Sequence, residues 1–280
     1  MRTIQVEEIT RHIREMCIEA NYSLSLDMCR ALQHAETEEK SPLGRQILGQ
    51  LRENLEIAAA DNIPICQDTG MAVIFMEIGQ DVHFQGGSLE EAINEGVRQG
   101  YREGYLRKSV VGDPCIRENT RDNTPAVIHY ELQPGAEVKI TVAPKGFGSE
   151  NMSRVFMLKP SDGIEGVREA VLTAVRDAGP NACPPMVIGV GIGGTFEKCA
   201  LMAKKALTRP VGEHSAVPYI EEMEKELLRK INASMIGPGG LGGTTTALAV
   251  HIDTYPTHIA GLPVGVNICC HVNRHAVRIV

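Results

Sequence analysis

Residues 184–207, PPMVIGVGIGGTFEKCALMAKKAL, contain the change of periodicity that decides the class of fold. The first half is a short, continuously apolar run that ends in glycines, which is typical of a buried strand. The second half, TFEKCALMAKKAL, consists mainly of strong helix formers and predicts a helix. A strand that passes through glycines into a helix is typical of proteins that mix helices with strands.

The same two patterns recur along the 280 residues. Helix formers dominate residues 3–60, and further helices are predicted at 88–106, 163–179 and 218–234. Strands are predicted at 71–79, 126–133, 137–144, 246–256 and 262–272. We therefore predict one mixed α/β (α+β) domain over 1–280, with a mainly helical lead-in over 1–60, a mixed core over 61–280, and Gly-rich turns after strands that form a site.

Composition argues against several classes of protein. The net charge is −7 and no Lys/Arg-rich run stands out, which argues against a nucleic-acid partner. No apolar stretch reaches the roughly 18 residues of a membrane helix, and MRTIQVEEITRHIREMC at the N-terminus does not resemble a signal peptide. We expect a cytoplasmic protein with no membrane partner.

The glycine-rich segments do not match the common nucleotide-binding motifs. GVGIGG fits G-x-G-x-x-G only through Gly189, Gly191 and Gly194, and no acidic residue follows a second strand about 20 positions later. GPGGLGGTTT lacks the Gly-Lys-Ser/Thr ending of a P-loop. These glycines indicate tight turns or a close approach of the backbone to some other ligand.

Eight cysteines without a Cys-x-x-Cys pair indicate neither a disulfide framework nor a local zinc site. Three of them, Cys17, Cys29 and Cys199, lie in helix-like sequence, where a cysteine usually packs as a small hydrophobic residue. Three others lie in loops rich in glycine, proline or polar residues: Cys66 in NIPICQDTG, Cys183 in NACPP and Cys270 in NICCHVNRHA. Each of these could be a buried filler, a nucleophile or a metal ligand.

Four separate segments resemble, in the same order, the alpha component of the class I (iron-sulfur) fumarate hydratases and the related tartrate dehydratases. They are ICQDTG, NACPP with GVGIGG, GPGGLGGTTTALAVHID, and CHVNRHA, and the resemblance extends over about residues 5–280. The resemblance implies that Cys66, Cys183 and Cys270 hold a 4Fe-4S cluster whose fourth iron has no protein ligand. Three thiolates leave that iron available as a Lewis acid.

Two other cysteines compete for the third ligand position. Cys269 and Cys270 are adjacent, so in a strand their side chains point to opposite faces and only one can reach a cluster. The family pattern of Cys, His and then Arg-His matches Cys270, which leaves Cys269 to pack. Cys115 lies in the loop GDPCIRENT and is the reserve candidate, although the family places no ligand there.

The resemblance implies reversible hydration of fumarate to L-malate. Gln67 and Asp68 match residues that contact the substrate, with Asp68 a candidate for proton transfer, and His258 matches an active-site histidine. Taken alone, Asp68 could equally form an Asx-type turn, and a single histidine is more often a satisfied core residue.

The dianionic substrate requires cationic and backbone donors. Arg107 matches a substrate-binding arginine that could pair with a carboxylate, although a solvated arginine at a helix end is the simpler alternative. The segment APKGFGSEN matches a family glycine loop near the substrate, which implies that Lys145, Gly146, Phe147 and Gly148 bind the substrate. Phe147 stands where family members often have another glycine.

The resemblance covers only the alpha component of the family, because KGFGS at residues 145–149 matches that component's own glycine loop and not the Lys-Gly-x-x-Ser/Thr loop of the beta component. The resemblance therefore implies a separate beta subunit and a hetero-oligomer such as α2β2. An alternative is the alpha subunit of a tartrate or other hydroxydicarboxylate dehydratase. A non-catalytic iron-sulfur cluster-binding module is the alternative from another class, and such a carrier would need neither Arg107 nor Gln67 and Asp68.

Overall fold

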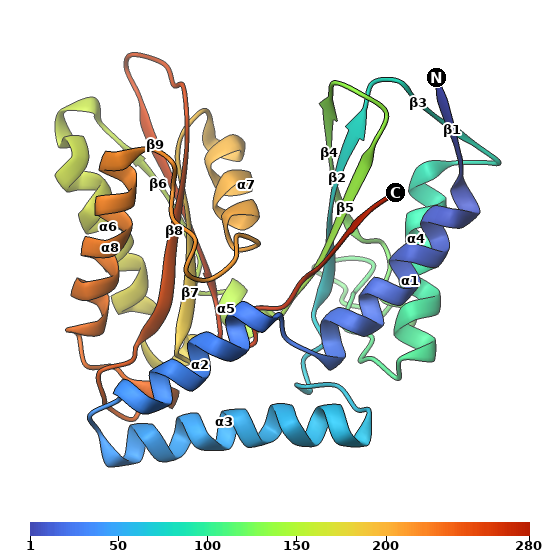
Figure 1. The fold of residues 1–280 in the computed structure, drawn as a ribbon. Helices are drawn as coiled ribbons and strands as arrows, with labels where there is room; N and C mark the ends of the chain where they lie inside the picture. Colours follow the sequence, from blue (N-terminus) through green and yellow to red (C-terminus); the bar gives the residue numbers. More distant parts are fainter. The chain divides into compact units, whose positions relative to one another are not determined.

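The structure is a computed structural model that describes residues 1–280. The chain forms two compact units, each built from segments that are distant in sequence and each centred on its own four-stranded sheet (Figure 1). Unit 1 comprises Met1–Ser25, Leu55–Phe147 and Arg274–Val280, and unit 2 comprises Leu26–Asn54 and Gly148–Asn273. None of the helices combines the length and hydrophobicity needed to cross a lipid bilayer.

Unit 1 contains two complete helices and two sheets. Its elements are β1 (Arg2–Gln5), α1 (Val6–Tyr22), β2 (Met71–Gly79), β3 (Val82–Gln85), α4 (Leu89–Glu103), β4 (Val127–Gln133), β5 (Val138–Lys145) and β10 (Ala276–Ile279). The main sheet has the order β10-β5-β2-β4, in which β4 runs parallel to β2 and the other pairs are antiparallel. Strands β1 and β3 form a separate parallel pair.

Helices α1 and α4 cover one face of the main sheet in unit 1. Alternate residues of β2, including Ile74 and Met76, join the buried cluster that these helices complete. The two helices approach closely because α4 carries glycine at the contact, where a Cβ on Gly96 would lie 2.7 Å from the Cβ of Ile13. Ser88 caps α4 by accepting a hydrogen bond from the N–H of Glu91, as the sequence predicts.

Unit 2 contains a second sheet with helices on both faces. Its elements are α2 (Leu26–Glu38), α3 (Pro42–Asp61, which continues into unit 1), α5 (Phe147–Glu150, which begins in unit 1), β6 (Arg154–Leu158), η1 (Pro160–Asp162), α6 (Gly163–Ala178), η2 (Gly179–Ala182), β7 (Met186–Gly193), α7 (Phe196–Ala206), α8 (Pro218–Asn232), η3 (Pro238–Gly240), β8 (Ala247–Tyr255) and β9 (Leu262–Cys269). The sheet has the order β6-β9-β7-β8, with β7 and β8 parallel and the other pairs antiparallel.

In unit 2, helices α6 and α8 pack on one face of the sheet and α7 on the other (Figure 1). A Cβ on Gly189 would lie 2.0 Å from the carbonyl oxygen of Ala203, and one on Gly191 would lie 2.2 Å from that of Cys199. The glycines of GVGIGG therefore allow α7 to lie directly against the strand backbone.

The predicted mixed α/β class is confirmed, and so are the predicted strands and helices within a few residues at their ends. The order of strands in unit 1 is less obvious. Strands β4 and β5 follow each other along the chain, yet β2 lies between them. The connecting turn passes across the end of β2, where the N–H of Gly79 donates to Glu137 O at 2.8 Å and the N–H of Asp81 donates to Gly135 O at 3.0 Å.

Candidate active site

The QDTG loop, residues 67–70, leads into β2 of unit 1 and is held by buried side chains. The hydroxyl of Tyr101 donates to the carbonyl oxygens of Thr69 and Gly70, at 2.8 and 3.0 Å. The side-chain amide of Asn123 donates to Gly70 O at 3.2 Å. Because Tyr101 and Asn123 are both fully buried, these bonds fix the loop backbone in one position.

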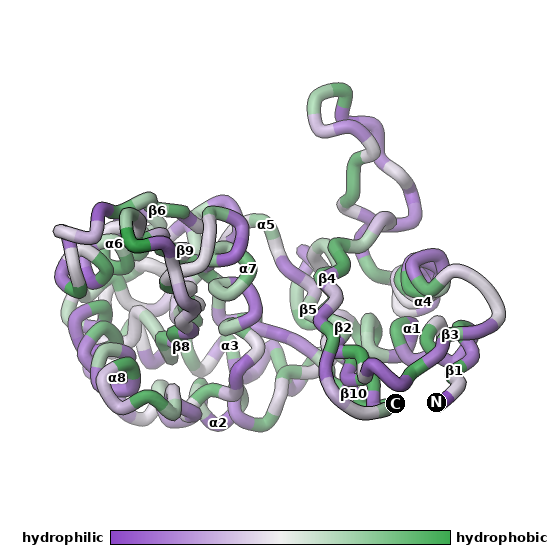
Figure 2. The backbone as a smooth tube through the Cα atoms, turned by 90° about the horizontal axis from the view of Figure 1, so that it is seen from above, coloured by the Kyte–Doolittle hydropathy of each residue, from purple (hydrophilic) through white to green (hydrophobic).

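Thr69 joins this loop to Arg107. The backbone N–H of Arg107 donates to Thr69 Oγ1 at 2.9 Å, and the Thr69 hydroxyl donates to Arg107 O at 3.2 Å. Arg107 belongs to the segment between α4 and β4. In Figure 2 this segment makes an excursion away from the rest of unit 1. The side chain of Arg107 is exposed, so the guanidinium is available to an anionic ligand.

Asp68 joins the same loop to the glycine segment that follows β5. Its Oδ1 accepts from the N–H of Gly70 at 3.0 Å, which is the Asx-type turn, and its Oδ2 accepts from the N–H of Phe147 at 2.9 Å. Register explains this proximity, because Met71 at the start of β2 pairs with Lys145 at the end of β5. A Cβ on Gly146 would lie 3.1 Å from Asp68 Oδ2.

The remaining residues of this segment differ in exposure. Lys145 is buried and its Nζ donates to Gly146 O at 3.3 Å, whereas the side chain of Phe147 is 48% exposed. Gly148 is exposed and is the first residue of the adjoining unit 2 segment. Unit 1 thus brings Asp68, Arg107 and the 145–147 segment together.

Cys66 lies immediately before this group. It is half-buried, and its thiol donates to the side-chain oxygen of the exposed Gln67 at 3.3 Å. A half-buried thiol on a fixed loop is accessible to a metal.

Cys183 and Cys270 lie at the same end of the sheet in unit 2. Strands β7 and β9 are antiparallel and Val187 pairs with Cys269, so the segment that leads into β7 and the residue that follows β9 lie at the same end of the sheet. The N–H and Nδ1 of His271 both lie within hydrogen-bonding distance of Cys183 O, at 3.4 and 3.0 Å. Cys183 is exposed and has a left-handed φ of 51°.

The other cysteines differ in their surroundings. Cys269 is 5% exposed within β9, whereas Cys270 is partly exposed beyond it. Burial raises the pKa of Cys17 to about 12 and also raises that of Cys199, so both stay protonated at neutral pH. Cys115 is exposed on the excursion between α4 and β4.

The three predicted cluster ligands are divided between the units, with Cys66 in unit 1 and Cys183 and Cys270 in unit 2. Within neither unit do three His, Cys, Asp or Glu side chains gather closely enough to hold a metal ion. The donor set nevertheless fits an iron-sulfur group, because all three are thiols outside disulfides and none is fully buried.

His258 lies away from the two cysteines of unit 2. It is exposed on the loop between β8 and β9, and its Nδ1 accepts from the N–H of Ala260 at 3.2 Å. Strand β9 separates His258 from Cys270, and its eight residues correspond to roughly 27 Å of extended chain.

A sequence model of the fumarate hydratase (Fumerase) family matches residues 10–278. The chain belongs to the fumarate hydratase family. It is 42% identical over 277 residues to the putative L(+)-tartrate dehydratase subunit alpha of Methanocaldococcus jannaschii, with 97% of each chain covered. It is also 30% identical over 258 residues to the L(+)-tartrate dehydratase subunit alpha of Escherichia coli O157:H7, covering 91% of this chain and 84% of that one.

These comparisons confirm the resemblance to iron-sulfur fumarate hydratases and tartrate dehydratases. The family match includes every candidate site residue from Cys66 to Cys270. Two buried polar clusters of this family member, however, were not predicted from its sequence.

The first unpredicted cluster surrounds Glu39. Its carboxylate accepts from the backbone N–H groups of Ser41, Thr244 and Thr245 at 2.7 to 2.8 Å. Burial acts to raise the pKa of Glu39, but these hydrogen bonds outweigh burial and lower it to about 2. Glu39 thereby anchors the glycine-rich loop whose Gly239 N–H donates to Pro184 O at 2.9 Å, next to Cys183.

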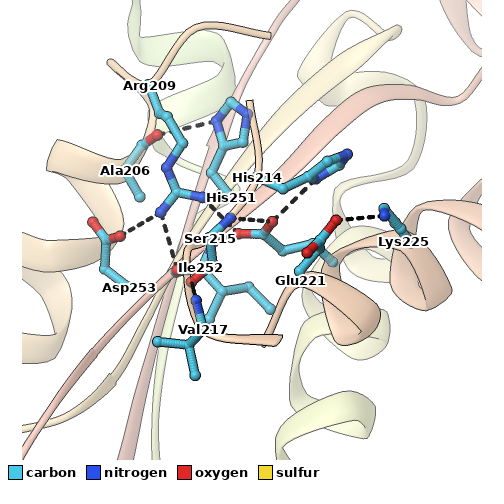
Figure 3. Close-up of polar contacts among 11 residues, drawn as sticks. Ala206, Arg209, His214, Ser215, Val217, Glu221, Lys225, His251, Ile252 and Asp253 are labelled. Atoms are coloured by element: carbon cyan, nitrogen blue, oxygen red, sulfur yellow. Dashed lines mark hydrogen bonds and ion pairs between the residues drawn. The ribbon is translucent and has the colours of Figure 1, made fainter. Parts of the chain in front are cut away.

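The second unpredicted cluster surrounds Glu224 at the edge of β8 (Figure 3). The Glu224 carboxylate accepts from Arg209 at 2.6 Å, from the N–H of Ser215 at 3.0 Å and from the N–H of Ile252 at 2.8 Å. Burial lowers the pKa of the neighbouring His251 to about 4, so its imidazole is neutral at pH 7. The network supplies hydrogen-bond partners to β8, which is an edge strand of the sheet. It has no link to the candidate site residues.

Proposed function

We propose that this chain is the alpha subunit of an iron-sulfur hydro-lyase that catalyses the reversible hydration of fumarate to L-malate. The observation that carries the proposal is the joining of Asp68, Arg107 and the 145–147 segment around one fixed loop that also carries Cys66. An exposed arginine and a carboxylate held by the same loop, together with a glycine-rich backbone, are suited to binding a small dianion and to catalysing its reaction. Family membership supports the same chemistry.

Cys66, Cys183 and Cys270 would hold a 4Fe-4S cluster. When bound, such a cluster supplies a Lewis-acidic iron that polarises an oxygen of the substrate. For the third ligand we choose Cys270 over Cys269, because Cys269 is 5% exposed within β9 and Cys270 lies beyond it.

The residues of unit 1 would bind and orient the substrate. Arg107 would pair with one carboxylate, and the exposed Gln67 side chain would donate a further hydrogen bond. Asp68 is oriented by the N–H groups of Gly70 and Phe147 and would contact the substrate as a proton-handling group. Lys145, Gly146, Phe147 and Gly148 would also contact the substrate. Lys145 donates to Gly146 O and so stabilises the turn, and the exposed Gly148 would leave its backbone accessible to the ligand.

His258 is proposed as a further proton-handling residue. Because β9 separates it from Cys270, a His258 side chain that acts at the cluster would come from a second copy of the chain. This assignment is therefore linked to the oligomeric state.

A beta subunit would complete the enzyme. The names of the similar chains from Methanocaldococcus jannaschii and Escherichia coli O157:H7 each describe a subunit alpha, which supports a partner of a different sequence. We propose a hetero-oligomer such as α2β2, in which the partner supplies the catalytic base.

L(+)-tartrate is the second candidate substrate. The chains that are 42% and 30% identical to this one are both named as L(+)-tartrate dehydratase alpha subunits. Malate and tartrate share two carboxylates and a hydroxyl on the carbon next to one of them, so the same alpha-chain residues could serve either substrate.

The deciding experiment is an anaerobic assay of the chain co-expressed with its beta subunit, with fumarate, L-malate and L(+)-tartrate tested side by side. The proposal expects a 4Fe-4S absorption spectrum and the largest kcat/KM with fumarate. Faster turnover of tartrate would select the second candidate, and a loaded cluster with no dehydratase activity would indicate a cluster-binding module. Full activity of this chain alone would refute the need for a beta subunit.

A further inference from the structure

Arg274 is a buried arginine with an unusual set of contacts. It lies just before β10 in unit 1, and its side chain carries a permanent positive charge although the residue is only 4% exposed. Its Nη2 donates to the carbonyl oxygen of Asp68 at 2.5 Å. The other two guanidinium nitrogens, Nε and Nη1, are buried and make no hydrogen bond.

A buried guanidinium with two unpaired nitrogens is energetically unfavourable unless a ligand binds beside it. A buried charged group normally satisfies its donors and lies beside an opposite charge, because removing a cation from water otherwise costs several kcal/mol. The nearby Arg278, which is partly exposed on β10, shows the ordinary arrangement, because it donates to Glu15 at 2.5 Å and to Glu19 at 3.0 Å. Arg274 makes a single bond, to a neutral carbonyl.

The position of Arg274 indicates which anion its guanidinium binds. The carbonyl that it holds belongs to Asp68, two residues after Cys66 and within the loop that Tyr101 fixes. Two residues of chain span at most about 7 Å, so the guanidinium lies close to the backbone of the proposed cluster ligand. Thiolates and inorganic sulfides accept hydrogen bonds, and such bonds help to set the properties of an iron-sulfur group.

We propose that Arg274 is a cofactor-binding residue. Its two buried, unpaired nitrogens would donate hydrogen bonds to the anionic iron-sulfur group that Cys66 would help to hold. This inference rests on the proposed function. The proposal explains why the Arg274 guanidinium lies next to the Cys66 loop with only one of its three nitrogens in a hydrogen bond. It also predicts opposite behaviour for Arg274 and Arg278, which a purely structural role for both would not produce.

The test compares Arg274→Gln and Arg274→Lys with Arg278→Gln in the full chain, handled anaerobically. In the metal-free protein, Arg274→Gln should change Tm by no more than about 1 °C, because it removes an uncompensated buried charge. Arg278→Gln should lower Tm by about 2 to 4 °C, because it breaks satisfied ion pairs. A similar fall in Tm for Arg274→Gln would overturn the proposal.

The second measurement is the content of iron and sulfide per chain, with the visible absorption, after reconstitution and gel filtration. Arg274→Gln should bind the cluster about 10-fold more weakly, Arg274→Lys should be intermediate, and Arg278→Gln should match the wild type. Retention equal to that of the wild type in Arg274→Gln would overturn the proposal. A higher KM for the dicarboxylate with unchanged cluster retention would do the same, since it would assign Arg274 to the substrate. A wild-type chain that binds neither iron nor sulfide would refute the proposed function itself.

Discussion

Thr69 and Arg107 hold each other through a reciprocal pair of hydrogen bonds, although 37 residues separate them in the sequence. The hydroxyl of Thr69 accepts a hydrogen bond from the N–H of Arg107 and donates one to its carbonyl oxygen. The position of the candidate substrate-binding arginine is therefore set by the loop that carries Cys66.

Replacing Thr69 by valine should weaken substrate binding more than it slows turnover. Valine keeps the shape of threonine but leaves the partly buried N–H of Arg107 without its acceptor, which costs about 1 to 3 kcal/mol. We expect KM to rise roughly 5- to 10-fold with a smaller change in kcat, as measured by steady-state kinetics. Thr69→Ser keeps the hydroxyl and is the control; equal effects of both substitutions would contradict the role of the hydroxyl.

Arg107→Ala should raise KM for the dicarboxylate by about 30-fold or more, because a charge-assisted pair with a carboxylate is worth about 2 to 3 kcal/mol. Arg107→Lys should recover only part of this, since an ammonium cannot bind a carboxylate through two parallel N–H groups. The exposed Arg117, on the same excursion, offers a control in Arg117→Ala. Unchanged kinetics for Arg107→Ala would indicate that Arg107 is a solvated surface residue with no part in substrate binding.

Cys183→Ser and Cys270→Ser should each abolish the 4Fe-4S absorption after anaerobic reconstitution, because two thiolates do not retain such a cluster stably. The matched controls are the exposed Cys115→Ser and the buried Cys269→Ser, which should both keep the spectrum. If Cys269→Ser rather than Cys270→Ser lost the cluster, the third ligand would have to be reassigned.

Glu39→Gln should destabilise the protein at neutral pH and much less in acid. A carboxyl whose pKa falls from 4.5 in the unfolded chain to about 2 in the folded protein contributes about 3 kcal/mol of stability above pH 4.5. That contribution is lost as the pH falls from 4.5 towards 2. Urea unfolding at pH 7 and at pH 3 should show the difference between wild type and Glu39→Gln shrink, while Glu38→Gln, at an exposed neighbour, should show little effect at either pH.

A complementation experiment addresses His258. Because β9 separates His258 from Cys270, His258→Asn and Cys270→Ser damage opposite ends of the sheet in unit 2. If His258 acts at the cluster of a second copy, co-expression of the two variants should recover part of the activity that each lacks alone. Activity no greater than that of the two variants assayed separately would exclude this arrangement.

Much of the fold could be predicted because periodicity is a local property. The helix of residues 163–178 and the strand of 186–193 follow from hydrophobic pattern and glycine stops. Strands β1, β3 and β6 are four or five residues long and were missed, because so short a run shows no clear period. The placement of β2 between β4 and β5 depends on contacts across the sheet, which no local pattern encodes.

The candidate site could be predicted only as a set of separate residues. Sequence motifs indicated Asp68 and Arg107, but nothing in them indicated that Thr69 joins the two. Glu39 lies in a charged stretch, ETEEKSP, that reads as solvated surface, and its role is visible only once Thr244 and Thr245 are placed beside it. Such long-range hydrogen bonds carry no sequence signal of their own.

The order of segments in unit 1 has a consequence for how the protein is made. Strand β10 pairs with β5, and Arg274 holds the carbonyl of Asp68, yet both follow the whole of unit 2 along the chain. During synthesis on the ribosome, unit 2 can therefore fold while the Cys66 loop still lacks one of its anchors. Insertion of the proposed cluster would have to wait until the segment from Arg274 onward has left the exit tunnel and β10 has paired with β5.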